Sequence, residues 1–85
     1  MAYRLTYTRE AEKNLAALSK ADARRILTKL EQLAADPRAM TGVRKLTGRE
    51  GYRLRSGDWR ALFLLDHGEL LVIVISVGNR RDVYR

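Results

Sequence analysis

The first half of the chain changes from a two-residue to a helical spacing of apolar positions. Residues 3–8 are apolar at every second position, which predicts a strand with one buried face. Thr8 can cap a helix behind that strand, and Ser19, with Asp22 three residues on, forms a capping box that opens a second helix. The second helix ends at the Asp-Pro pair at 36–37. Because almost no linker separates them, the two helices are predicted to form a helical hairpin.

The second half of the chain has the patterns of strands and tight turns. Residues 38–50 contain two glycines and no periodicity, so they are predicted to be irregular. Strands are predicted at 52–55, 59–65 and 70–77, separated by a Gly-Asp turn and by a second turn at Asp-His-Gly-Glu. The last of these segments is apolar without alternation, which predicts a central strand that is covered on both faces and breaks at Gly78.

Together these elements predict one α+β domain over residues 1–85. Its N-terminal strand and helical hairpin are followed by a three-stranded antiparallel meander, which completes a four-stranded sheet with the helices packed on one face. The chain has no cysteine, which excludes disulfides and cysteine metal sites. No segment has the length of a bilayer span or the pattern of a signal peptide, so we expect a cytoplasmic protein without membrane contact.

The formal net charge of +7 is concentrated in two segments. Residues 44–60 carry a net charge of +4 and residues 78–85 carry +2, which leaves +1 for the rest of the chain. Such concentrated positive charge attracts polyanions, and nucleic acid is the leading candidate. An acidic protein partner is the alternative. A membrane surface is disfavoured because the sequence has no basic amphipathic helix.

Three arginines surround the Gly-Asp turn at 57–58. If these two residues are the centre of the turn, Arg55 lies opposite Arg60 and Arg53 lies opposite Leu62, so all three guanidinium groups share one sheet face. A three-residue loop would shift this pairing by one. Like charges directly opposite each other destabilise a sheet, so the arrangement indicates an anion, and phosphate suits the guanidinium fork. The other face is predicted to lie under the helices, with Tyr52, Leu54, Trp59, Ala61 and Phe63.

The closing segment ISVGNRRDVYR at 75–85 and the earlier segment KLTGREGYRLRSGDWRALFLL together resemble the RelE/ParE superfamily of bacterial toxins, the RelE branch in particular. The shared features are Leu46-x-Gly48, the Tyr-Arg-Leu-Arg strand, the Gly-Asp-Trp-Arg turn and the closing Gly-x-Arg…Val-Tyr. Because the strand order and the helical hairpin also agree, the resemblance covers essentially the whole chain.

This resemblance implies the toxin of a type II toxin–antitoxin system, a ribosome-dependent endoribonuclease that cuts messenger RNA in the A site and inhibits translation. It implies attack of an RNA 2′-hydroxyl on the neighbouring phosphate. Arg60 and Arg80 would stabilise the charge that builds on the phosphoryl oxygens, and Tyr84 would stack on or hydrogen-bond the nucleotide and assist proton transfer. Arg53 and Arg55 would hold the RNA backbone. The mechanism implies no metal and no cofactor.

Other basic residues are assigned to substrate binding. Arg44 and Lys45 lie in the predicted loop and would steer the protein towards the RNA backbone, and Arg81 would contact ribosomal RNA or remain solvated. The general base is open. RelE toxins carry lysines on the strand where this chain has Gly51 and Arg53, and an arginine does not lose its proton.

Three residues are weighed for that base. Tyr84 would need strongly positive surroundings to act as one, Glu50 is a weaker candidate, and His67 is interpreted as an ordinary turn histidine.

The resemblance also implies partners and leaves two further activities open. The partners are a cognate antitoxin, the ribosome and messenger RNA, and the toxin–antitoxin complex can bind operator DNA through the antitoxin. A ParE-like protein that inhibits DNA gyrase without nuclease activity is the main alternative. A non-catalytic RNA-binding module is the other.

Overall fold

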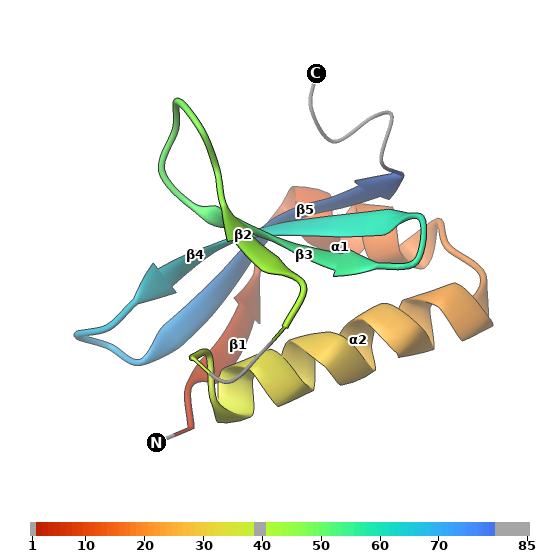
Figure 1. Ribbon diagram of the computed structural model, residues 1–85. Coiled ribbons are helices and arrows are strands. Elements are labelled where there is room, and N and C mark those ends of the chain that lie inside the picture. Colours follow the sequence, from red (N-terminus) through yellow and green to blue (C-terminus); the bar gives the residue numbers. More distant parts are fainter. Residues whose placement is uncertain (1, 39–40, 80–85) are drawn as a thin grey trace.

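The computed structural model describes residues 2–38 and 41–79 and shows a two-layer α+β arrangement (Figure 1). The elements in chain order are β1 (Arg4–Tyr7), α1 (Arg9–Ala16), α2 (Lys20–Ala35), β2 (Val43–Lys45), β3 (Tyr52–Ser56), β4 (Trp59–Asp66) and β5 (Leu71–Asn79). The sheet has the strand order β1-β5-β4-β3-β2, in which β1 runs parallel to β5 and the other neighbours are antiparallel. Both helices contribute to one core on a single face of the sheet.

Both predicted helix caps are confirmed. The Thr8 hydroxyl oxygen accepts a hydrogen bond from the backbone N–H of Ala11 at 3.1 Å. The Ser19 hydroxyl oxygen accepts one from Asp22 N–H, also at 3.1 Å. Each cap satisfies one of the amide groups that a helix start leaves without an intrahelical partner. The helical hairpin therefore begins where local side-chain chemistry predicts.

The predicted four-stranded sheet is wrong by one strand, because β2 forms within the segment that was predicted to be irregular. Arg44 pairs with Arg53 across the β2–β3 ladder. Beyond the ends of this short ladder, Arg55 N–H donates to the Gly42 carbonyl at 3.1 Å, and Leu46 N–H donates to the Gly51 carbonyl at 2.9 Å. A strand of three residues is too short to show a period of two, which is why the sequence pattern does not reveal it.

The prediction that residues 70–77 are covered on both faces and end at Gly78 is also wrong. β5 continues to Asn79, and one of its faces is buried while the other is half-buried. The apparent lack of alternation comes from a β-bulge. Phe63 pairs with Val74 whereas Leu62 pairs with Ser76, so Ile75 is an extra residue in β5. The buried positions of β5 fall on both sides of the bulge, at Val72, Val74 and Val77.

Side chains of the α1 region continue the edge of β5 where β1 ends. Thr8 N–H donates to the Val74 carbonyl at 3.0 Å, and the Thr8 hydroxyl donates to the Ile75 carbonyl at 2.5 Å. Asn14 Oδ1 accepts a hydrogen bond from Val77 N–H at 2.9 Å. Backbone groups at the bulge are thereby satisfied without a strand beside them. These contacts hold the C-terminal half of β5 in place.

The core lies between the helices and the sheet. Its fully buried side chains are Phe63, Ile26, Leu30, Leu33, Leu54, Val72 and Val74. The members from α2 recur at helical spacing and the others come from β3, β4 and β5, as the apolar pattern predicts. In the described part of the chain, no helix combines the length and the apolar character that a membrane crossing requires.

Candidate nucleic-acid interface

The β3–β4 hairpin has the predicted two-residue turn. Ser56 pairs with Trp59, and Arg55 pairs directly with Arg60. Gly57, the first central residue of the turn, has a φ of +61°, which is a conformation that glycine adopts at little cost and that suits a tight hairpin. The pairing of Arg53 with Leu62 follows in the same register. The predicted placement of the three arginines on one face is therefore confirmed.

The opposite face of this hairpin packs under the helices, as predicted. Leu54, Ala61 and Phe63 are buried there, and Tyr52 and Trp59 pack against the same core. The rings of Tyr52 and Phe63 are stacked with centroids 5.6 Å apart. The position of Trp59 agrees with its interpretation as a core aromatic rather than a platform for RNA bases.

The strand β2 adds a fourth arginine to this face. Arg44, which was predicted to lie in a loop, sits directly opposite Arg53. Residues directly opposite each other in an antiparallel ladder project from the same face. Arg44 therefore joins the other three on the sheet face away from the helices, and we call these four residues the arginine face. Lys45 pairs with Tyr52 and so belongs to the other face, apart from the group with which it was predicted to act.

The arginine face contains two like-charged cross-strand pairs, Arg44–Arg53 and Arg55–Arg60. Each such pair costs the sheet about 0.2–1 kcal/mol. Arg44 and Arg55 are exposed and Arg53 is half-buried, so positive charge is available to a ligand along β2 and β3. The fold does not need this arrangement, which indicates an anionic ligand.

Arg60 differs from the other three because its side chain is only 8% exposed. Its Nη1 donates to the Gly57 carbonyl at 3.1 Å and to the Trp59 carbonyl at 3.2 Å. These acceptors are neutral, so they orient the guanidinium group without cancelling its charge. A donor fixed in this way does not have to reorganise when negative charge develops nearby. The turn therefore pre-orients Arg60.

The predicted site residues Arg80, Arg81 and Tyr84 lie outside the described residues, so their convergence with Arg60 stays a prediction. The structure does show where the described chain ends. Gly78 pairs with Arg60, and Asn79, the last described residue, pairs with Trp59. The described part of β5 thus ends beside the hairpin turn.

The structure also bears on the search for a general base. Gly51 has a φ of +117°, and a Cβ atom at this position would lie 3.1 Å from the Phe63 carbonyl oxygen. A lysine cannot be accommodated there without strain and a collision with the backbone of β4. Glu50 is exposed beside this glycine.

His67 lies in the turn after β4, as predicted, at the end of the strand opposite to Arg60. Its Nδ1 is hydrogen-bonded to the Tyr3 hydroxyl at 2.6 Å, and the two rings meet edge to face. These contacts agree with a structural role for this turn histidine.

Comparison with known proteins identifies the family. A sequence model described as "ParE toxin of type II toxin-antitoxin system, parDE" matches residues 5–84. The chain belongs to the RelE/ParE toxin superfamily. It is accordingly the toxin of a type II toxin–antitoxin system, and the resemblance carried by its motifs is confirmed. Among curated protein sequences, none matches this chain.

Solved RelE structures share the fold of this RelE/ParE member. The RelE–RelB complex from Pyrococcus horikoshii matches with a TM-score of 0.82 and 27% identity, over 98% of this chain and 100% of that chain. The isolated RelE toxin of Escherichia coli matches with a TM-score of 0.74 and 30% identity, over 98% and 92% respectively. The RelBE2 toxin–antitoxin complex from Mycobacterium tuberculosis matches with a TM-score of 0.80, and at 19% identity it supports the fold alone; it covers 94% of this chain and 100% of that chain.

Proposed function

We propose that this toxin is a RelE-like, ribosome-dependent endoribonuclease that cuts messenger RNA in the A site. The observation that carries the proposal is the arginine face, with two directly opposed arginine pairs on the side of the sheet that the helices leave open. Four guanidinium groups at this spacing suit a phosphodiester backbone, which offers successive anionic oxygens. The similarity to RelE toxins at 27–30% identity supports the same activity.

In the proposed reaction, the RNA 2′-hydroxyl attacks the adjacent phosphorus and the bond to the 5′-oxygen breaks. A 2′,3′-cyclic phosphate forms, the 2′-hydroxyl proton passes to a base, and the leaving 5′-oxygen takes up a proton. Arg60, pre-oriented by the carbonyls of its turn, stabilises the charge on the phosphoryl oxygens together with Arg80. Tyr84 stacks on or hydrogen-bonds the nucleotide.

The residues of β2 and β3 hold the RNA in this proposal. Arg44, Arg53 and Arg55 bind the message backbone, and their positions are fixed by the β2–β3 and β3–β4 registers. Because the arginine face contains no group that readily accepts a proton, the enzyme depends on the ribosome to align the 2′-hydroxyl with the phosphate. The protein partners of the proposal are a cognate antitoxin, through which the complex binds operator DNA, and the ribosome.

A translation reaction tests the proposal. Messenger ends are mapped after adding the wild-type toxin, the Arg55→Ala variant, or Arg9→Ala as a control that removes one exposed arginine from α1. We expect breaks within A-site codons for the wild type and the control, a large loss for Arg55→Ala, and no breaks in naked RNA. Intact messages in the wild-type reaction would contradict the nuclease.

One observation favours a second candidate function. The family description that matches the sequence is that of ParE, and a ParE-like toxin would inhibit DNA gyrase without cutting RNA. In that case the arginine face would bind a protein or gyrase-bound DNA. Gyrase-linked DNA breaks in the presence of this toxin, with intact messages, would establish this alternative.

A further inference from the structure

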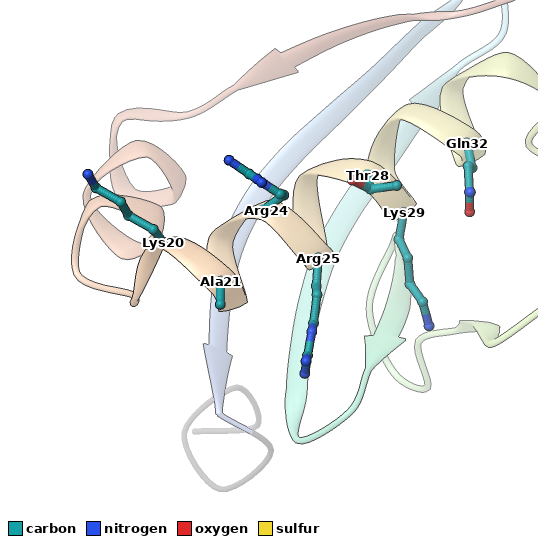
Figure 2. A pocket seen from close by; sticks show the side chains of 7 residues that line it. All are labelled: Lys20, Ala21, Arg24, Arg25, Thr28, Lys29 and Gln32. Atoms are coloured by element: carbon teal, nitrogen blue, oxygen red, sulfur yellow. The ribbon is translucent and has the colours of Figure 1, made fainter.

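A second cationic surface lies on the outer side of α2. A shallow groove of about 690 Å³ follows this helix, and its floor contains the small side chains Ala21 and Thr28. Four cations flank it, Lys20, Arg24, Arg25 and Lys29 (Figure 2). We call this surface the α2 groove. From the sequence these residues were interpreted only as a solvated helix face.

The α2 groove carries positive charge without local compensation. None of its lining residues is acidic, and the described part of the chain shows no ion pair to Lys20, Arg24 or Arg25. Lys29 Nζ donates to the Arg55 carbonyl at 3.2 Å, so one edge of the groove reaches the β3–β4 hairpin. The concentration of charge therefore stays available to a ligand.

The four cations form two parallel rows. Figure 2 shows Lys20 and Arg24 extending to one side of the helix while Arg25 and Lys29 extend to the other. Each row has an i, i+4 spacing, which corresponds to a rise of about 6 Å along the axis, and like charges at this spacing destabilise a helix by about 0.2–0.5 kcal/mol. As on the arginine face, repeated like charges indicate an anionic partner.

The composition of the groove distinguishes a nucleic acid from an acidic protein segment. Protein interfaces depend on a few large apolar or aromatic anchors in pockets. The α2 groove has no such side chain, since its lining beyond the cations is Ala21, Thr28 and Gln32. Binding to a phosphate backbone needs only cations and polar groups at a suitable spacing.

We propose that the α2 groove binds the phosphate backbone of a folded RNA, separately from the message bound by the arginine face. This inference extends the proposed ribosomal function, because the two surfaces lie on opposite sides of the sheet. A toxin on the ribosome would hold messenger RNA on its sheet and ribosomal RNA along α2. The α2 groove then contributes affinity and orientation, and no chemistry.

Binding to an RNA duplex of about 20 base pairs, followed by fluorescence anisotropy from about 50 to 200 mM salt, tests the inference without any cleavage. The variant is Arg24→Glu/Arg25→Glu, and the matched control is Arg9→Glu/Lys13→Glu on α1, which changes the net charge equally at exposed positions. We expect the α2 variant to bind the duplex at least 10-fold more weakly than the control. Its salt slope should also fall by about two phosphate contacts.

Further variants separate the possible outcomes. The neutral Arg24→Gln/Arg25→Gln should show the same loss in smaller measure, which removes any doubt that introduced acids disturb the helix. Equal weakening by the α1 control would overturn the inference, as would a duplex affinity unchanged by the α2 variants. Selective binding of a poly-glutamate peptide at the α2 groove, with duplex binding unchanged, would also overturn it in favour of a protein partner.

The test distinguishes failure of this inference from failure of the proposed function. Arg53→Ala/Arg55→Ala should lose messenger cleavage on ribosomes and keep most of the duplex affinity. If the wild type cleaves messages while the α2 variants bind the duplex normally, only the inference fails. If the wild type does not cleave but the α2 variants lose duplex binding, only the nuclease proposal fails.

Discussion

Replacing Gly51 by alanine tests how closely β3 must approach β4 to position the arginine face. The φ of +117° at Gly51 costs a side-chain-bearing residue about 1–3 kcal/mol. A Cβ atom there would also lie 3.1 Å from the Phe63 carbonyl oxygen and 3.2 Å from Leu64 Cδ2. The first contact is with backbone that cannot rotate away, so overpacking adds about 1–3 kcal/mol.

The unfolded chain of an alanine variant has less entropy, which returns about 0.4–1 kcal/mol. The net expected loss in the free energy of unfolding for Gly51→Ala is thus about 2–4 kcal/mol. Gly48→Ala is the matched control, because Gly48 has a φ of +77° but a Cβ there would meet nothing within 4 Å. Its expected loss is about 1 kcal/mol, from backbone strain alone.

Urea unfolding of the two variants measures the difference directly. An extra loss of about 2 kcal/mol for Gly51→Ala would correspond to a melting temperature lower by about 8–16 °C in a domain of this size. Equal losses in the two variants would refute the steric reasoning, because the strained backbone is common to both positions and only the collision differs.

Three further predictions concern stability. Burial, with a smaller effect of the nearby Glu31 charge, raises the pKa of Tyr7 above 10.0, so the contribution of Tyr7 to stability should be complete below about pH 10 and fall as the pH rises further; Tyr7→Phe should lessen that alkaline loss in urea unfolding. Asn14→Ala leaves the Val77 N–H without its acceptor and should cost about 1–3 kcal/mol, whereas Asn14→Asp, which keeps an acceptor oxygen, should cost less in the same assay. Ser19→Ala removes the cap of α2 and should cost about 1 kcal/mol, and an unchanged midpoint of thermal unfolding would contradict this.

Features that depend on neighbouring residues were predictable from the sequence. The caps at Thr8 and Ser19 arise from side chains that bond amides three residues away, so a short pattern contains the whole interaction. The Arg55–Arg60 pairing follows from the Gly-Asp turn, because a two-residue hairpin loop sets the register of both strands. Placing these two arginines on one face required no knowledge of the distant chain.

Features that depend on distant contacts were not predictable in this way. β2 exists only because β3 provides a ladder for it, and its three residues carry no pattern of their own. The bulge at Ile75 results from the pairing of β5 with β4 and disguises the alternation that would have shown one exposed face. The pairing of Arg44 with Arg53 was missed for the same reason. A valine followed by two cations in residues 43–45 was the available signal, and it is too short to indicate a strand.

The central claim is that the arginine face binds the message for cleavage. Its most direct test is the single-turnover rate of messenger cleavage on programmed ribosomes, compared among the wild type, Arg53→Ala/Arg55→Ala and the control Arg9→Ala/Lys13→Ala on α1. Both double variants remove two positive charges, but only the first pair lies on the arginine face. We predict a rate reduced at least 100-fold for the first variant and a rate within about threefold of wild type for the control. Equal rates for the two variants would contradict the claim.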